Sequence, residues 1–528
     1  MESRLLFWCS GSETEKYSLH ENEKYIIWLS GLLYYGESDA DRDIFSIVSR
    51  FERGELDFNK LHGFYRLVVF DKNSESFFFW GDNSSSQYFF IDETRGLFSD
   101  SFLSLVRGRR GNISLCHEAA VQLISNIIFD ELTLVEGIVR SSPEKYYRFV
   151  DKKIETLDKG LQPFCQCSGE EVFKITESLL AAARDWKCGA VCTGGTDSRV
   201  ILSYLSYKNV LPPLVITGHA DNPDVAVAEI IADKLGLPLS CIDPAEKSGD
   251  WLEKAFEFSD GCYDSVLSYR HLQVLRWAED KDLNCIYGGV GGEFYKNSFC
   301  FPVRHRAFAK AFDSLRLFRL LVSSRMKLPA WAGEELLASR SEFISRCEKD
   351  LSAFREGGSV LNGFNRFGYQ ILRNRAGAVT NAFAGRCTRI DPLMDREAAA
   401  KISHKNPWLL SMYIWHRRQI AKYCKALCDV PTDQGYTCTV RPMKLLFERV
   451  RKGLYWVNKA LARFGFAQRK TVDYWRADYI EARSDPLFRQ GFDICKNAGV
   501  ISQNANESDI ENSQLGNIIL IGQLFSLK

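Results

Sequence analysis

Residues 189–199 read Gly-Ala-Val-Cys-Thr-Gly-Gly-Thr-Asp-Ser-Arg, and this stretch decides the fold. A short apolar run leads into two glycines, and residues 198–208 follow with helical spacing. Glycine lets the backbone turn tightly and bring its N–H groups close to an anion. The positive end of the following helix faces the same point. The stretch therefore predicts a strand, a phosphate-binding loop and a helix.

The side chains of this loop supply further groups that could bind a phosphate or a metal ion. Thr193 and Ser198 supply hydroxyl donors. Asp197 would repel a bare phosphate, which predicts that it holds Mg²⁺ bridging the phosphate oxygens. The loop is neither a Walker A loop nor a dinucleotide-binding Gly-x-Gly-x-x-Gly. An unrelated α/β protein with ordinary glycine turns is the alternative.

The segments around the loop predict a parallel sheet followed by helices. Helical spacing covers residues 171–186 and 224–235, the second with Asp224 as its N-cap, and short apolar runs at 214–217 and 284–287 predict strands. Strands that alternate with helices are typical of a parallel sheet with helices on its faces. Residues from 307 to the end are expected to be mostly helical.

The first 160 residues have a different pattern. Apolar or aromatic runs at 25–29, 64–71, 76–80 and 88–91 are separated by polar turns, and only residues 40–52 and 118–127 have helical spacing. This pattern predicts stacked antiparallel sheets. We expect two domains, residues 1–165 and 170–528.

A second glycine cluster, residues 286–294, reads Ile-Tyr-Gly-Gly-Val-Gly-Gly-Glu-Phe and follows another predicted strand. Four glycines in five positions allow a close approach of the backbone to a ligand. Glu293 ends the cluster, where a second metal ligand would be useful. The alternative interpretation is a flexible loop with a capping acid.

Together the two loops resemble the synthetase domain of the asparagine synthetase B family, which includes β-lactam synthetases and lasso-peptide cyclases. The family's Ser-Gly-Gly-x-Asp-Ser loop has Thr193 in place of its first serine here, and its Gly-x-Gly-x-Asp loop has Glu293 in place of Asp. Residues 389–395 are similar to the family's Arg-Val-Pro-Phe-Leu-Asp segment. Residues 61–71 and 98–100 are similar to stretches of its N-terminal glutaminase domain, so the resemblance covers nearly the whole chain.

This resemblance implies an α/β fold with an N-terminal Ntn-hydrolase-like αββα sandwich and a C-terminal ATP-pyrophosphatase (adenine nucleotide α-hydrolase-like) parallel-sheet domain with a helical extension. It implies that ATP and Mg²⁺ activate a carboxylate as an acyl-adenylate, releasing pyrophosphate, and that ammonia or an amine then displaces AMP. The expected catalytic residues are Asp197, Glu293 and Lys444, the first two as metal ligands. The residues expected to bind the nucleotide are Thr193, Gly194, Gly195, Thr196, Asp197, Ser198, Val215, Thr217, Gly218, Gly289 and Gly291.

Departures from the family pattern shape the expected activity. Residue 2 is Glu2 where the glutaminase has its catalytic cysteine, and Gly81 and Tyr88 replace the family's Arg and Pro. We therefore expect no glutamine hydrolysis. Val290 replaces a general-base candidate. Residues 431–436 lack the family's lysine, for which Lys444, Lys425 or Arg441 could substitute.

Without glutaminase activity, the amine must come from free ammonia, a separate amine substrate, an amine-supplying or substrate-carrier protein, or the same molecule, as in the β-lactam and lasso reactions. Two other classes stay open. One is a nucleotide-binding partner protein with weak or no turnover. The other is a tRNA-modifying thiolase that uses a cysteine, although the balanced charge and the absence of paired cysteines count against it.

The segment from Arg441 to Lys470 holds nine Lys or Arg residues and one acid, with apolar residues interleaved at helical spacing. One interpretation is a solvated helix face. The other is a docking face for an anionic substrate, such as a sugar acid or a nucleotide-linked sugar, for a partner, or for a membrane surface.

The composition of the whole chain disfavours several classes of protein and of binding site. The chain has 528 residues, with 68 Lys and Arg against 67 Asp and Glu, which does not favour a nucleic-acid binder. Its 16 cysteines contain no Cys-x-x-Cys pair, so zinc sites are not indicated. No secretory signal or membrane-spanning run is found, and we expect a cytoplasmic protein with reduced thiols.

Overall fold

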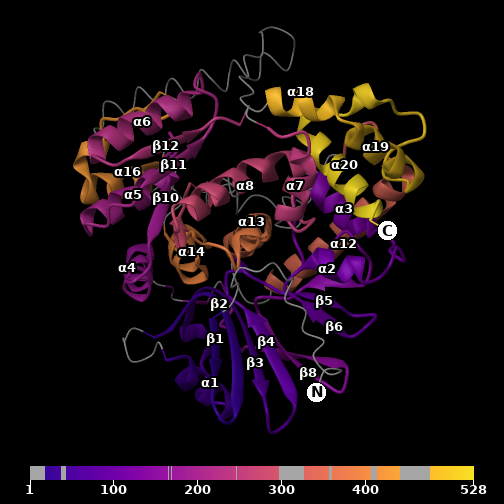
Figure 1. The fold of residues 1–528 in the computed structure, drawn as a ribbon, viewed down its shortest axis with the longest axis horizontal. Coiled ribbons are helices and arrows are strands. Elements are labelled where there is room, and N and C mark those ends of the chain that lie inside the picture. The colour runs from indigo at the N-terminus through magenta and orange to yellow at the C-terminus, as the bar shows by residue number, and fades with distance from the viewer. Residues whose placement is uncertain are drawn as a thin grey trace.

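The computed structural model describes residues 18–36, 43–164, 166–167, 169, 171–244, 247–296, 326, 328–355, 360–405, 413–433, 435–440 and 476–527. Glu2, Lys444 and the basic segment 441–470 lie outside these residues, as does residue 434. Figure 1 shows the antiparallel strands at one end of the molecule, and the parallel sheet and the C-terminal helices side by side at the other.

The antiparallel part contains two sheets, of order β1-β2-β3-β4-β8-β9 and β6-β5-β7. Their strands are β1 (Ser18–Glu21), β2 (Tyr25–Tyr35), β3 (Leu61–Asp71), β4 (Ser76–Gly81), β5 (Phe90–Asp92), β6 (Leu97–Ser99), β7 (Ile138–Arg140), β8 (Lys145–Val150) and β9 (Lys153–Asp158). The two sheets pack face to face through a largely aromatic cluster, in which the rings of Phe79 and Phe98 stack with centroids 3.9 Å apart.

Helices cover both outer faces of this pair of sheets. The apolar face of α1 (Ile44–Glu52) packs on the larger sheet. Helices α2 (Phe102–Arg107) and α3 (His117–Ile124) share a cluster with Phe90 of the smaller sheet. Because side chains alternate along a strand, Phe90 and Ile91 enter different clusters. The layers are therefore helix, sheet, sheet, helix.

The parallel part is a five-stranded sheet of order β12-β11-β10-β13-β14. Its strands are β10 (Cys188–Val191), β11 (Leu214–Thr217), β12 (Leu239–Ile242), β13 (Cys285–Tyr287) and β14 (Thr388–Ile390), and every neighbouring pair is parallel. Leu214 and Ile216 enter one core cluster, while Val215 and Ile286 enter another. The strands are thus buried on both faces, as parallel sheets usually are.

Two sets of helices cover these faces. The cluster with Leu214 includes α4 (Val172–Ala182), α5 (Asp197–Tyr207) and α6 (Pro223–Leu235), and the cluster with Val215 includes α7 (Trp251–Phe258) and α8 (Ser265–Asp280). The later helices are α9 (Gly292–Tyr295), α12 (Glu334–Arg355), α13 (Val360–Phe383), α14 (Arg396–Ser403), α16 (Ile414–Tyr423), α18 (Arg476–Ser484), α19 (Pro486–Asn497) and α20 (Asn512–Phe525).

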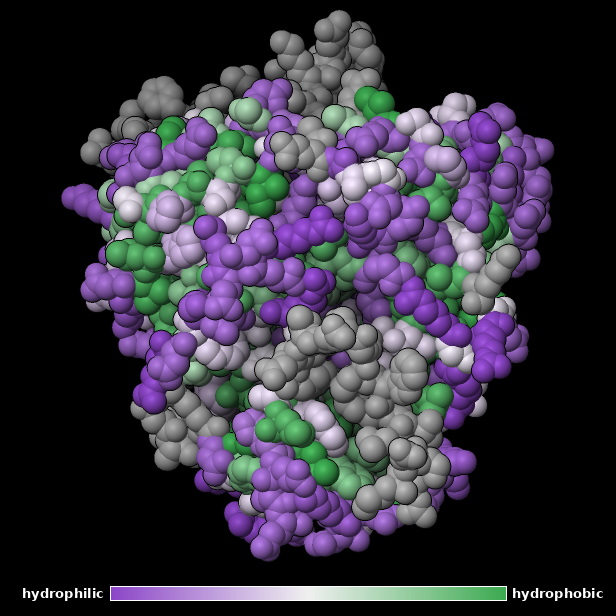
Figure 2. Space-filling view, viewed as in Figure 1, coloured by the Kyte–Doolittle hydropathy of each residue, from purple (hydrophilic) through white to green (hydrophobic). Residues whose placement is uncertain are grey.

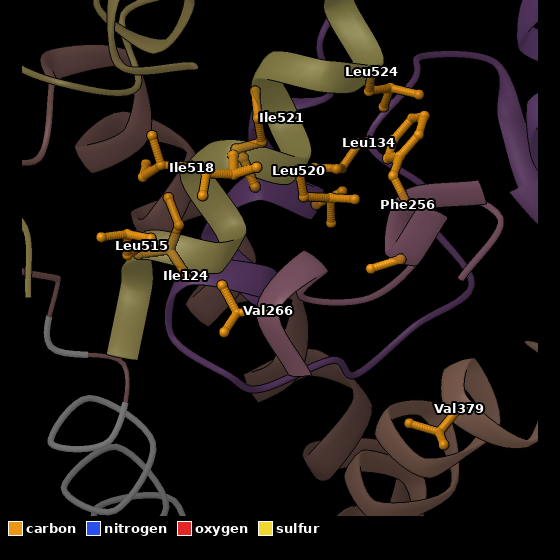
Figure 3. Packing of buried hydrophobic residues seen from close by; sticks show 14 of the residues in the cluster. Ile124, Leu134, Phe256, Val266, Val379, Leu515, Ile518, Leu520, Ile521 and Leu524 are labelled. Carbon is orange, nitrogen blue, oxygen red and sulfur yellow. The ribbon is translucent and has the colours of Figure 1, made fainter. Parts of the chain in front are cut away.

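Helix α20 joins the two parts of the chain. Its apolar residues lie on all sides, which is typical of a buried helix. Figure 3 shows Leu520 and Ile521 of α20 in one cluster with Ile124 of α3 and Phe256 of α7. One core cluster therefore contains residues from both the antiparallel and the parallel part, and the boundary between residues 165 and 170 stays a prediction.

The surface contains both hydrophilic and hydrophobic side chains. On the face shown in Figure 2, hydrophilic side chains predominate, and hydrophobic ones form small groups between them. Within the described ranges, no helix combines the length and the apolar character needed to cross a membrane.

The predicted mixed α/β fold, with antiparallel sheets followed by a parallel sheet and helices, is confirmed in this form. Two details differ. The strand expected at residues 88–91 is β5, Phe90–Asp92, because the N–H groups of Tyr88 and Phe89 donate to the side chains of Asn381 and Ser141 instead of to a neighbouring strand. The N-cap of α6 is Asn222 rather than Asp224, since Pro223 begins the helix and the Asn222 side chain accepts from Asp224 N.

Candidate functional site

The strand order of the parallel sheet marks one place for a ligand. Along the chain β11 and β12 follow β10 on one side, and β13 and β14 continue on the other. In open sheets of this kind, ligands bind outside the carboxyl ends of the strands where the direction of winding changes. Here that point lies between β10 and β13, and both predicted loops follow these two strands.

The first loop keeps part of its backbone unpaired. Among the residues that the structure describes, no acceptor is bonded to the N–H groups of Gly195, Thr196 and Asp197. Asp197 begins α5, an 11-residue helix whose N-cap makes no side-chain hydrogen bond. Free N–H groups at a helix N-terminus, together with the helix dipole, favour an anion.

Two hydroxyl groups lie across this loop. Thr193 Oγ1 and Ser198 Oγ are 2.9 Å apart, and Thr193 N donates to Ser198 Oγ over 3.2 Å. Of the residues that the structure describes beyond its chain neighbours, a methyl group added at Gly195 would have only Thr193 within 4 Å, with Oγ1 at 3.5 Å. Open space therefore lies over Gly195, next to the hydroxyl groups and the unpaired N–H groups.

Gly194 has different surroundings. Its N–H donates to Asp224 Oδ1 over 3.1 Å, and an added methyl group would lie 2.7 Å from that oxygen. Asp224 can reach it because Asn222 caps α6. The predicted contribution of Gly194 to phosphate binding is thus limited, because its N–H already has an acceptor.

Arg199 ties the loop to a distant segment. Its side chain is fully buried and donates to Gly194 O over 3.1 Å, to Val430 O over 2.7 Å and to Pro431 O over 3.0 Å. Asp433 N donates to Gly194 O as well, over 3.3 Å. Residues 430–433 therefore form a wall of the site that is held through Arg199.

The glycines of the second loop pack against the first loop. A methyl group at Gly289 would lie 2.4 Å from Ser198 N, and one at Gly292 would lie 2.0 Å from Asp197 Cγ. Gly291 has a φ of 98°, which favours glycine. Gly289 and Gly292 are therefore needed for the close approach of the two loops.

Asp391 holds the second loop in position. It follows β14, accepts from Val290 N over 3.0 Å, and accepts from Arg389 Nε over 2.7 Å. The Val290 side chain itself packs against the core. The loop is thus fixed by the segment 389–395 that the sequence had singled out.

A lysine and a histidine flank Asp197. Lys296 Nζ lies 2.6 Å from Asp197 Oδ2, and His416 Nε2 lies 2.9 Å from Asp197 Oδ1. Burial raises the pKa of Asp197, but the contact with His416 and the charge of Lys296 outweigh it and hold the pKa below its usual range. Burial lowers the pKa of Lys296, but Asp197 more than compensates and raises it.

His416 and Glu293 are two further titratable groups near Asp197. Burial lowers the pKa of His416, although Asp197 acts in the opposite direction. Desolvation by the surrounding protein and the negative charge of Asp197 raise the pKa of the Glu293 carboxyl. Glu293 is nevertheless exposed to solvent on one side. Asp197 and Glu293 therefore lie close enough for their charges to interact.

These residues do not fit a resident Mg²⁺. Magnesium needs near-octahedral oxygen ligands, and both carboxylate oxygens of Asp197 already face nitrogen atoms, one of them the ammonium group of Lys296. In the part of the chain that is described, no group of three or more His, Cys, Asp or Glu residues could hold a metal ion. The predicted role of Asp197 and Glu293 as metal ligands is thus not supported by the donor set.

The other predicted residues are spread around this edge of the sheet. Thr217 and Gly218 lie at the carboxyl end of β11. The side chain of Val215 is fully buried in the core, so it packs between sheet and helices instead of facing a ligand. Lys444 lies outside the described residues.

Sequence reasoning missed Lys296, His416 and Arg199. Lys296 follows Glu293 by three residues and comes directly after α9, and this spacing from the second loop was the available signal. The positions of His416 and of Arg199 relative to residues 430–431 depend on contacts between distant segments, for which the sequence carried no signal. In comparisons with known proteins, no family model matches the chain, and no curated protein matches it.

Proposed function

We propose that this protein is an ATP-dependent ligase that activates a carboxylate as an acyl-adenylate and transfers the acyl group to ammonia or an amine. The observation that carries the proposal is the set of N–H groups at Gly195, Thr196 and Asp197, which have no acceptor among the described residues. They lie where the direction of winding along the sheet changes, between β10 and β13. In this reaction a carboxylate attacks the α-phosphate of ATP and pyrophosphate leaves. The ATP enters as its magnesium complex, so that ion belongs to the substrate.

The chain's own residues suit the departure of a diphosphate. Negative charge develops on the leaving group, and prearranged N–H donors and cations stabilise such charge. The N–H groups of the loop, the hydroxyl groups of Thr193 and Ser198, and the ammonium group of Lys296 lie at the same edge of the sheet. Arg199 and Asp391 fix the two loops without facing the ligand themselves.

The finer fold assignment is part of this proposal. The helix, sheet, sheet, helix layers of residues 18–158 are consistent with an Ntn-hydrolase-like sandwich, and the strand order of residues 188–390 is consistent with an ATP-pyrophosphatase domain. Both are the parts expected from the resemblance to the asparagine synthetase B family.

The N-terminal domain is proposed to have no glutaminase activity. Its loop after β4 is closed by Asp82, whose buried carboxylate accepts from the N–H groups of Ser84, Ser86 and Gln87 over 2.8, 3.1 and 2.7 Å. Burial raises the pKa of Asp82 to about 6. This carboxylate has a structural role, and the amine is proposed to come from solution, from a partner protein or from the substrate itself.

The experiment is ATP turnover with panels of carboxylic acids in the presence of hydroxylamine. Formation of AMP, pyrophosphate and a hydroxamate is expected. Formation of ADP and phosphate would exclude acyl-adenylation. A glutaminase assay run in parallel is expected to release no glutamate.

A nucleotide-binding protein without turnover is the second candidate. It is favoured by Val290, an apolar, partly buried residue. Enzymes of the asparagine synthetase B family, which the chain resembles, have a general-base candidate at this position. Binding of ATP without AMP formation, across all acids and amines, would support it over the ligase.

A further inference from the structure

We propose that Lys296, anchored on Asp197, is the fixed cation that meets the phosphates of the bound nucleotide, and that Asp197 positions this lysine instead of ligating a divalent cation. The inference rests on the proposed nucleotide site and names the residue that supplies the positive charge in it. It concerns a residue that follows the second loop and that contacts the first.

The position of Lys296 is set by its surroundings. It directly follows α9, and Lys296 Nζ lies 2.6 Å from Asp197 Oδ2 and 5.4 Å from the ring centroid of Tyr413. The side chain of Lys296 is 21% exposed. Its ammonium group is thus held against the N-terminus of α5 while part of the side chain still reaches solvent.

The tyrosine beside Lys296 is itself constrained. Tyr413 has a φ of 58° and a ψ of 25°, a left-handed conformation that bulky residues rarely adopt. Its ring stacks on that of Tyr436 with centroids 5.1 Å apart. Such conformations persist where the surrounding structure enforces them. The lysine therefore has an ion-pair partner on one side and a fixed aromatic ring on the other.

Asp197 has an arrangement that suits an anchor. One of its oxygens faces Lys296, and the other faces His416 Nε2, a side chain with no exposed surface. A divalent cation at Asp197 would have to displace an ammonium group and a buried imidazole. A phosphate, in contrast, would add to the arrangement, because Lys296 can donate to it while keeping Asp197 as a partner: an ammonium group has three donors.

The ion pair between Lys296 and Asp197 also removes the repulsion that Asp197 alone would exert on a phosphate. Asp197 beside a bare phosphate would be repulsive, but Lys296 neutralises it. The unpaired N–H groups and the helix dipole then remain as net attraction. The loop can therefore accept a diphosphate without a metal ion bound to the protein.

Binding of inorganic pyrophosphate and of ATP by the full chain tests the inference, measured by calorimetry in EDTA and again in excess Mg²⁺. Wild-type protein is expected to bind pyrophosphate in EDTA. Lys296→Met should weaken this binding roughly 10- to 100-fold, the contribution of one charge-assisted hydrogen bond. Lys281→Met, an exposed lysine after α8, is the matched control and should bind as the wild type does. Asp197→Asn, which leaves the lysine without its anchor, should weaken binding equally in both buffers.

A second measurement needs no variant. Acetylation of lysines by acetic anhydride, followed by mass spectrometry of the wild-type protein, should show that pyrophosphate protects Lys296 but not Lys281. Protection of neither lysine would overturn the inference.

Two further outcomes separate the inference from the proposed function. If Mg²⁺ strengthens binding, Asp197→Asn removes that gain and Lys296→Met keeps it, then Asp197 is a metal ligand, and the inference is wrong while the nucleotide site stands. If the wild-type protein binds neither ATP nor pyrophosphate in either buffer, the inference and the proposed function both fall.

Discussion

Replacement of Arg199 by methionine should loosen the nucleotide site and destabilise the protein. Arg199 is fully buried, and its guanidinium group donates to three carbonyl oxygens, those of Gly194, Val430 and Pro431. Each buried acceptor that loses its donor costs about 1–3 kcal/mol. Part of this is offset, because the variant no longer buries a charge, which leaves a net loss of about 3–5 kcal/mol.

The expected size of the effect follows from the length of the chain. A cooperative unit of 528 residues has an unfolding entropy of about 1.1 kcal/mol/K, so the loss corresponds to a fall in Tm of about 3–5 °C. Residues 430–433 should also lose the part of their attachment to Gly194 that runs through Arg199 and keep only the bond from Asp433 N to Gly194 O. If this loosened wall costs about one to two kcal/mol of binding free energy, ATP affinity should fall about tenfold.

Differential scanning fluorimetry and ATP titration by calorimetry measure both effects. Arg418→Met is the matched control, because Arg418 lies exposed on α16 and its replacement should leave Tm and affinity unchanged. If Arg199→Met has the Tm and the ATP affinity of Arg418→Met, the proposed coupling between the loop and residues 430–433 is refuted.

Two further predictions concern packing and pH. Gly292→Ala should lower Tm and abolish ATP binding, because the new methyl group would lie 2.0 Å from Asp197 Cγ and push the two loops apart; an unchanged Tm would contradict this packing. Burial raises the pKa of Asp264 from 3.8 to about 6, so the folded protein holds this proton more tightly than the unfolded chain does. Its stabilising effect is complete below about pH 4 and is lost as the pH rises through about 6, by up to about 3 kcal/mol. Asp264→Asn lacks this titration, so its Tm should rise relative to that of the wild type between pH 4.5 and pH 7; a constant difference in Tm would count against the raised pKa.

The fold was predictable where local patterns are strong. Short apolar runs that are followed closely by glycines became β10, β11 and β13, and the polar turns between aromatic runs separated the antiparallel strands. The start of α6 was misplaced because Asn222 and Asp224 can both act as caps, and the decision depends on Pro223 at the first helical position.

The site was only partly predictable. The two loops were found because glycine and hydroxyl patterns are local. The partners of Asp197 were not, because Lys296 is 99 residues away and meets Asp197 only once β10 and β13 pair in parallel. Arg199 reaches Val430 across 231 residues through the packing of α5 and α16. Such contacts depend on the tertiary fold, and a single sequence carries no local signal for them.

Binding of ATP to a Gly195→Ala variant tests the central claim most directly. Without ligand, the added methyl group would have, among the described residues outside its chain neighbours, only Thr193 Oγ1 within 4 Å, at 3.5 Å, so folding and Tm should be unchanged. The same methyl group would project into the space where the phosphates are proposed to lie, next to the unpaired N–H groups. Calorimetry should show ATP binding to the wild type and a loss of affinity of at least about tenfold in the variant. Equal ATP affinity in the two proteins, at equal Tm, would show that the loop after Thr193 does not hold the nucleotide.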